Sequence, residues 1–259
     1  GVTQVVTATG GGFGTGVARA LRAVPPAEGE EEWLWLLRAD SAPEPDALRA
    51  LLAAVEVAPS VAVAGPKLVD PDDHARLRSY GETVSRLGAT VVLVEDELDQ
   101  AQYDQVTDVL AVAVDGALVR RPVWHALDGV DPGLPAADTG LDLGIRARLA
   151  GHRVVRVPDA RVERARNPED LGRKRPASPR VRRRIARSAQ LHRRFVYAPA
   201  LLVPLIWLAL LPLAIIRSLG QLLAKRPDAV PGELSAAFRA LVDPTVPGAR
   251  SRLRRGSKV

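Results

Sequence analysis

Apolar and polar positions follow two different periods along the first 160 residues of the chain. Apolar residues that recur every three or four positions predict helices over 14–24, 45–57, 122–127 and 141–150. Short β-branched or apolar runs predict strands over 2–8, 32–37, 61–64, 90–94, 109–114 and 153–157. Strands that alternate with helices in this way favour an α/β layer architecture.

A different pattern begins at Phe195, where 22 residues up to Ile216 carry no charged side chain. At about 1.5 Å per residue, this run is long enough to cross a hydrocarbon core about 30 Å thick. Prolines inside the run would kink a spanning helix or make it re-entrant. A buried helix of a soluble domain is the alternative interpretation.

Farther along, residues 232–242 predict a short amphipathic helix suited to a membrane interface.

Charge is distributed unevenly between the two parts of the chain. Residues 1–160 hold 14 basic and 24 acidic side chains, whereas residues 161–259 hold 22 basic and 6 acidic ones. Thirteen of the basic residues lie between Arg161 and Arg194, directly before the apolar run, which predicts that the preceding domain is cytoplasmic. The cluster contains no aromatic residues that would stack on bases, so we expect anionic membrane lipid and not nucleic acid as its partner.

These patterns divide the chain into four predicted parts. They are an α/β domain over 1–160, a basic juxtamembrane linker over 161–194, a hydrophobic membrane segment over 195–224 and a basic tail over 225–259. The chain has no cysteine, which excludes disulfides and thiolate metal sites.

A glycine-rich turn, Gly10 to Gly16, follows the first predicted strand and opens a helix. Its spacing fits neither the dinucleotide-binding fingerprint nor the P-loop. It can still bring backbone N–H groups close to an anion, and a tight strand-to-helix turn is the structural alternative.

Asp40 follows the apolar run that contains Trp33 and Trp35. A carboxylate at the end of a buried strand can hold a divalent cation, although an aspartate there is also a common helix cap.

The order of these features resembles the membrane-associated family 2 glycosyltransferases of actinobacteria over about residues 8 to 165. The resemblance rests on Gly12-Phe13-Gly14, Trp33-Leu34-Trp35, Ala64-Gly65-Pro66-Lys67-Leu68, Gly116-Ala117-Leu118-Val119-Arg120-Arg121, Leu127-Asp128-Gly129-Val130-Asp131-Pro132 and Leu141-Asp142-Leu143-Gly144-Ile145-Arg146. It implies a GT-A fold, with a mostly parallel sheet and flanking helices. It also implies inverting transfer of a sugar from a nucleotide-sugar donor to a lipid-linked or cell-envelope polysaccharide acceptor.

The resemblance also assigns roles on the donor side of the site. It places Gly12, Phe13 and Gly14 beside the donor. Asp40 matches the last acidic residue of the metal-binding motif, where it would hold Mg²⁺ or Mn²⁺ against the donor diphosphate. The motif here reads Arg38-Ala39-Asp40, whereas family members usually have another acidic residue just before Asp40.

On the acceptor side, the resemblance places the catalytic acidic loop between Asp138 and Asp142. Thr139 and Gly140 align with the family's acidic pair, and neither can act as a base at neutral pH. Asp138 is therefore the predicted base. Asp142 and Arg146 complete the predicted catalytic set, with Arg146 orienting the loop or contacting phosphate, and Asp142 capping or bracing the helix.

Three functional hypotheses follow. The first is a glycosyltransferase on the cytoplasmic face of the cell membrane. By comparison with the family about fifty N-terminal residues are missing, so we expect this truncated fragment to be inactive by itself. The second is a catalytically impaired, transferase-like scaffold of an envelope-assembly complex, suggested by the losses at Ala39, Thr139 and Gly140. A soluble dehydrogenase, the third, is disfavoured by the glycine spacing and the apolar run.

Overall fold

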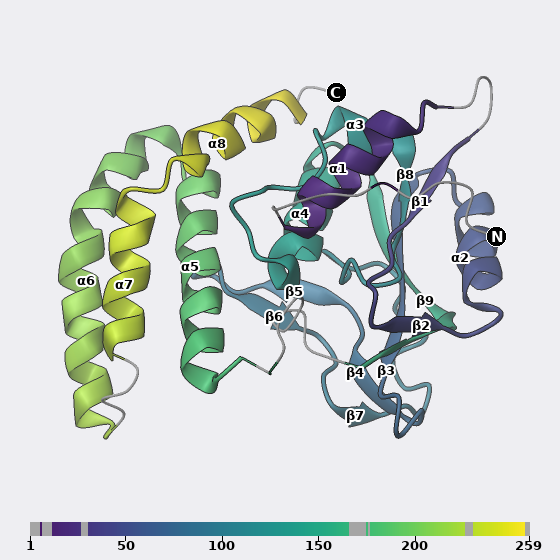
Figure 1. Cartoon of the computed structure of the whole chain (residues 1–259), viewed down its shortest axis with the longest axis horizontal. Helices are drawn as coiled ribbons and strands as arrows, with labels where there is room; N and C mark the ends of the chain where they lie inside the picture. The colour runs from purple at the N-terminus through teal and green to yellow at the C-terminus, as the bar shows by residue number, and fades with distance from the viewer. Residues whose placement is uncertain are drawn as a thin grey trace.

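The chain is seen in a computed structural model, which describes residues 12–26, 31–165, 177–225 and 230–256, together with residues 6 and 175. An α/β part extends to residue 165, and a group of four helices follows from Pro179 and lies beside it (Figure 1). The strand predicted over 2–8 lies outside the described residues except for residue 6.

The α/β part contains helices close to those that the sequence predicts. They are α1 (Phe13–Ala23), α2 (Ala47–Glu56), α3 (Arg121–Ala126) and α4 (Thr139–Leu149), with a short 3-10 turn, η1 (Ala136–Asp138), directly before α4. Each helix begins and ends within two residues of the predicted bounds. The four helix predictions are therefore confirmed.

Nine strands are described, and seven of them form one sheet. They are β1 (Trp33–Trp35), β2 (Ser41–Pro43), β3 (Val61–Val69), β4 (Arg76–Ser79), β5 (Glu82–Val84), β6 (Thr90–Val92), β7 (Glu97–Leu98), β8 (Leu118–Arg120) and β9 (Arg153–Arg164). Five of the seven strands follow the hydrogen-bonded order β1-β8-β3-β4-β7, in which β8 and β4 pair with the same edge of β3. Strand β9 pairs with the opposite edge of β3 and also with β2. A second sheet consists of the hairpin β5–β6.

The α/β architecture is confirmed, but the expectation of a mostly parallel sheet is wrong. Among the described strands, β3 and β9 pair in parallel, and the other pairs are antiparallel. Short turns join β3 to β4 and β5 to β6, and a chain that reverses in a short turn must pair antiparallel. β9 reaches its parallel place beside β3 after helices α3 and α4.

Three predicted strands differ from the structure, and one of them, predicted over 153–157, continues as β9 to Arg164. β3 does not stop at Gly65-Pro66 but continues to Val69, and its pairing with β9 shifts register between Pro66 and Lys67. Within the described residues, the segment 109–114 forms a single isolated bridge, between Ala111 and Glu82. Helix α4 lies directly against this segment, because a Cβ on Gly140 would meet the carbonyl oxygen of Val112 at 2.2 Å.

The C-terminal helices are α5 (Pro179–Tyr197), α6 (Val203–Leu223), α7 (Val230–Leu241) and α8 (Thr245–Gly256), with the 3-10 turn η3 (Ala200–Leu202) before α6. The basic segment 161–194 thus includes most of α5, which begins at the cap residue Ser178. The predicted amphipathic helix is confirmed as part of α7. Leu191 and Phe195 of α5 pack with Leu210 of α6 and Ala236 of α7 in a small apolar core.

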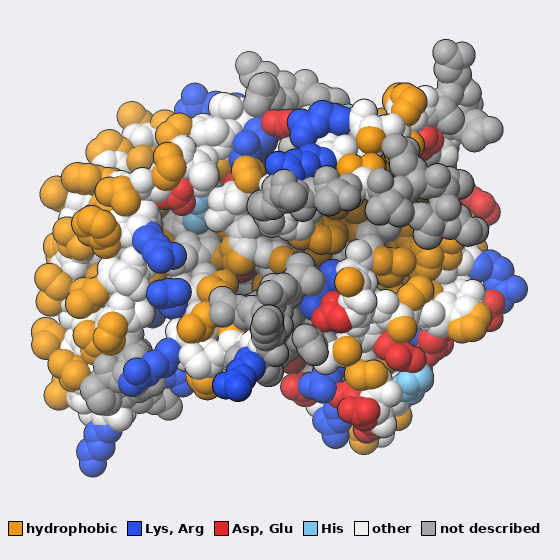
Figure 2. Space-filling view, in the orientation of Figure 1, with side chains coloured by type: hydrophobic (Ala, Val, Ile, Leu, Met, Phe, Trp, Pro, Cys, Tyr) orange, Lys and Arg blue, Asp and Glu red, His pale blue; other side chains and the backbone are white. Residues whose placement is uncertain are grey.

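One described segment, Ala200–Leu223, is long and apolar enough to cross a membrane, and only 11% of its apolar window is buried. The opposite side of α6 packs on α7, and the space-filling view shows a broad apolar surface over these two helices (Figure 2). The apolar run predicted from Phe195 is divided, because α5 ends at Tyr197 and α6 begins at Val203.

Candidate active site

A cavity of about 690 Å³ lies between the strands β4–β6 and the helices α5–α7. Asp138 and Glu82 line it on the α/β side, and arginines of α5 and α6 line it on the other. Its volume is in the range of pockets that hold small-molecule substrates. Of the residues predicted from the sequence, Asp138 lines this cavity.

Asp138 ends the turn η1 and is buried. Its Oδ1 accepts hydrogen bonds from Thr90 Oγ1 and from Arg193 Nη1, both at 2.5 Å. Arg193 in turn donates to Thr90 Oγ1 at 2.9 Å and to the carbonyl oxygen of Gly88 at 2.9 Å. The carboxylate is therefore held in place by the β5–β6 hairpin on one side and by α5 on the other.

Glu82, in β5, is a second buried carboxyl group on the cavity wall. Its Oε2 has no hydrogen-bond partner among the described residues. Burial, reinforced by the charge of Asp138, raises the pKa of Glu82 to about 8. A carboxyl group with such a pKa can exchange a proton near neutral pH.

Asp40 lies in a separate cluster, where its carboxylate is already paired. Arg38 donates from Nε to Oδ1 at 3.0 Å and from Nη2 to Oδ2 at 2.6 Å. The same guanidinium lies 3.4 Å from the buried carboxylate of Asp115, which also contacts Arg164 at 3.4 Å. Arg164 lines the cavity, so this cluster connects Asp40 to the cavity wall through alternating charges.

The Arg38–Asp40 pair does not fit a resident divalent cation. Both carboxylate oxygens of Asp40 accept from a guanidinium, and a cation would have to displace it. No three Asp, Glu or His side chains converge as a metal-binding group within the described part of the chain. In this arrangement a fixed positive charge stands where the family resemblance implies a metal ion.

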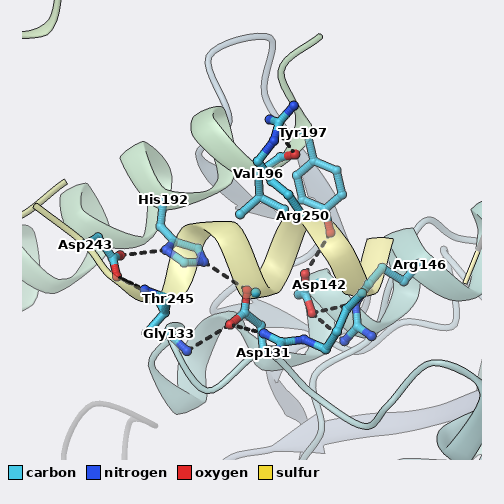
Figure 3. A network of polar contacts seen from close by, with 12 residues as sticks. Asp131, Gly133, Asp142, Arg146, His192, Val196, Tyr197, Asp243, Thr245 and Arg250 are labelled. Atoms are coloured by element: carbon cyan, nitrogen blue, oxygen red, sulfur yellow. Dashed lines mark hydrogen bonds and ion pairs between the residues drawn. The ribbon is translucent and has the colours of Figure 1, made fainter. Parts of the chain in front are cut away.

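Asp142 and Arg146 lie together inside helix α4 and are almost completely buried (Figure 3). Arg146 donates to Asp142 Oδ2 from Nε at 2.9 Å and from Nη2 at 2.6 Å, and also to the carbonyl oxygens of Leu127 and Gly129. Tyr197, the last residue of α5, donates to Asp142 Oδ1 at 2.7 Å. This geometry braces the loop before α4 and fastens α5 to it.

Asp131 and His192 form a second connection between the α/β part and the C-terminal helices (Figure 3). His192 Nε2 lies 2.9 Å from Asp131 Oδ2, and its Nδ1 lies 2.8 Å from Asp243 Oδ2. Arg252 of α8 completes the group with an ion pair to Asp131 at 3.0 Å. Burial opposes a charged imidazole, but the two carboxylates outweigh it and raise the pKa of His192.

Gly12, Phe13 and Gly14 lie at the start of α1, and the cavity is not lined by them. Phe13 packs against the main apolar core. A Cβ on Gly14 would lie 2.0 Å from Val130 Cγ2, so this glycine allows α1 to approach the loop before α4 closely.

Sequence reasoning found Asp138 but missed its neighbours Thr90, Glu82 and Arg193. In the sequence, Arg193 is one of thirteen basic residues in the predicted linker, and no pattern distinguishes it from the others. The one available signal for Glu82 was an acidic residue in the otherwise uncharged stretch between Tyr80 and Arg86.

An α/β domain with buried carboxyl groups beside an arginine-rich cavity is suited to an anionic substrate. The model of the family described as "Glycosyltransferase like family 2" matches residues 1–197, and the chain belongs to this family. The match ends at the last residue of α5, which leaves α6, α7 and α8 outside it.

A search among curated proteins finds no match. Among solved structures, the chain is similar to the one described as "Crystal structure of GalNAc-T7 with UDP, GalNAc and Mn2+", with 15% sequence identity and a TM-score of 0.42. The similarity covers 64% of this chain and 31% of that one, so the chain spans less than a third of that structure's length.

Proposed function

We propose that this chain is the sugar-transferring part of a membrane-associated glycosyltransferase with a GT-A fold. It takes the sugar from a nucleotide-sugar donor and passes it, with inversion, to a lipid-linked or cell-envelope polysaccharide acceptor. The observation that carries the proposal is the position of Asp138, buried in an arginine-lined cavity whose far wall includes the apolar helix α6. The family match to residues 1–197 supports the transferase class.

Asp138 acts as the general base that removes the proton of the acceptor hydroxyl. Among the described residues, its hydrogen bonds all go to Oδ1, and one of them comes from the hydroxyl of Thr90. An acceptor hydroxyl would donate to the same carboxylate in the same way. Arg193 balances the negative charge and fixes the orientation of the carboxylate.

The donor diphosphate needs positive charge beside it as the leaving group departs. Arg164 lines the cavity and, with Arg38, supplies fixed positive charge next to Asp115 and Asp40. The family resemblance implies a bound Mg²⁺ or Mn²⁺, but Asp40 is paired with Arg38 and does not fit one, so no step here depends on a metal ion.

The test is Asp138→Asn in the intact protein. We expect sugar transfer to fall by about 100-fold or more, while donor binding measured by calorimetry stays unchanged. Asp159→Asn, which changes an exposed aspartate of β9, is the matched control and should keep full activity. Wild-type turnover by the Asp138→Asn variant would show that the base is another residue.

The transferase-like scaffold is the second candidate function. It is favoured by the pairing of Asp40 with Arg38 and of Asp142 with Arg146, since both carboxylates are neutralised within the protein. Hydrolysis of a nucleotide sugar, or sugar transfer, by the intact protein would exclude it.

A further inference from the structure

Among the residues that the structure describes, the cavity lining carries more positive than negative side chains. Eight arginines and four carboxyl groups of this described part line it, and one of the four is Glu82, whose pKa of about 8 leaves it largely uncharged at pH 7. The arginines are Arg78, Arg164, Arg180, Arg183, Arg184, Arg187, Arg193 and Arg217. Like charges that share one cavity repel each other, and an anion in the cavity relieves the repulsion.

The repulsion is clearest around Glu233 of α7. This carboxylate is shared by two arginines, since its Oε1 lies 2.8 Å from Arg187 Nη2 and 3.1 Å from Arg217 Nε. Burial lowers the pKa of Arg187, Glu233 opposes this, and the charges of Arg217 and Arg194 lower it further. One carboxylate therefore does not balance the guanidinium groups around it.

The helix α6 connects this charged cavity to an apolar surface. Arg217 and Gln221, one turn apart on α6, line the cavity. Ile216, Leu219 and Leu223 of the same helix are more than half exposed. A molecule with an anionic head and an apolar chain would contact both surfaces at once.

We propose that the cavity binds the phosphate or diphosphate group of a lipid whose apolar chain lies along the exposed face of α6. Guanidinium groups bind phosphate oxygens through paired, charge-assisted hydrogen bonds, and several converge here. The inference rests on the proposed function, because it names the chemical class of the acceptor that Asp138 meets.

The phosphate could also belong to the nucleotide donor, but the apolar face favours the lipid. A nucleoside diphosphate would use the arginines and leave α6 without a ligand. A phosphorylated lipid uses both the arginines and the apolar side chains of α6.

The experiment measures binding to the whole purified chain in detergent micelles by calorimetry, with farnesyl diphosphate, farnesol, inorganic pyrophosphate and UDP as probes. We expect farnesyl diphosphate to bind at least tenfold more tightly than either farnesol or pyrophosphate, and its affinity to fall as salt is added. Arg184→Gln and Arg217→Gln should each weaken this binding about tenfold. Arg182→Gln, on the same helix as Arg184 but outside the cavity lining, should leave it unchanged.

Three results would overturn the inference: farnesol binding as tightly as its diphosphate, Arg182→Gln weakening binding as much as Arg184→Gln, or UDP binding more tightly than farnesyl diphosphate. The last result would assign the cavity to the donor. Sugar transfer is measured separately. Transfer without selective lipid binding would contradict this inference alone, whereas selective binding by a protein that transfers no sugar would contradict the proposed function alone.

Discussion

At the scale of single residues, Arg38 determines the chemistry around Asp40. Its guanidinium is buried and lies between the carboxylates of Asp40 and Asp115. Burial raises the pKa of Asp115, and Arg38 and Arg164 oppose this rise. The positive side chain of Arg38 thus neutralises the carboxylates that a divalent cation would otherwise neutralise.

Substitution of Arg38 tests this exchange of a metal ion for an arginine. In Arg38→Gln, two carboxylates lose their shared cation, so we expect added Mn²⁺ to raise the thermal unfolding midpoint of the variant and not that of the wild type. Arg49→Gln, which removes an exposed ion pair to Asp46, is the control. An equal rise in wild type and Arg38→Gln would mean that Arg38 does not occupy the cation's place.

Glu82 provides a pH test at the same scale. Its pKa rises from 4.5 in the reference state to about 8 in the fold, so the folded state resists ionisation. The wild type should therefore lose stability as the pH rises from about 4.5 to 8. Glu82→Gln has no such loss, and at pH 9 we expect it to be more stable than the wild type by on the order of 5 kcal/mol. Urea unfolding at several pH values measures this, and parallel pH profiles would contradict it.

At the scale of elements, helices were easier to predict than strand pairing. The apolar positions that predict α2 lie within ten consecutive residues. Strand β3, in contrast, pairs with β9, about ninety positions farther along the chain. The sequence predicts a linker where helix α5 lies, because the many arginines of α5 obscure the spacing of its apolar positions, such as Leu191 and Phe195.

The candidate site shows the same limit. The family resemblance identified Asp138, but its contact with Arg193 joins residues 55 positions apart, and that with Thr90 joins residues 48 apart. No local pattern reports contacts at such separations. The contact between Arg146 and Asp142 is different, because it joins residues four positions apart on one helix.

His192 connects α5 to Asp131 of the α/β part and to Asp243, which precedes α8, and these contacts depend on pH. The pKa of His192 is raised, so its contribution to stability is present below about pH 6.5 and is lost as the pH rises through its folded pKa. The pKa values of Asp131 and Asp243 are lowered, so their contributions are present above about pH 4 and are lost in stronger acid.

We therefore expect His192→Asn to lower the thermal unfolding midpoint most at pH 5 to 6 and least at pH 9. Differential scanning calorimetry across this range measures the difference. His74→Asn, at a half-exposed histidine in the α/β part, is the control. A deficit that is the same at every pH would show that His192 acts by packing and not by charge.

At the scale of the whole molecule, one face of α6 is apolar but is not buried by the rest of the fold. Leu205, Leu208 and Ile216 are more than half exposed, although the other side of the helix is packed on α7. Monomeric soluble proteins rarely expose so continuous an apolar surface, and such a surface marks an interaction with a membrane or a partner. Because the arginine-lined cavity opens beside the same helix, a bilayer at this face would bring lipid head groups to the candidate site.

The double substitution Leu208→Glu and Ile216→Glu tests this orientation. Two charges on the exposed face should reduce association with vesicles that contain anionic lipid by at least tenfold, because burying a carboxylate in the bilayer costs several kcal/mol. The circular dichroism spectrum should not change, since neither side chain belongs to the apolar core of α5, α6 and α7. Leu149→Glu, at an exposed leucine that ends α4, is the matched control and should bind vesicles like the wild type. If the double variant still floats with vesicles in a sucrose gradient as the wild type does, the membrane contacts another face of the molecule.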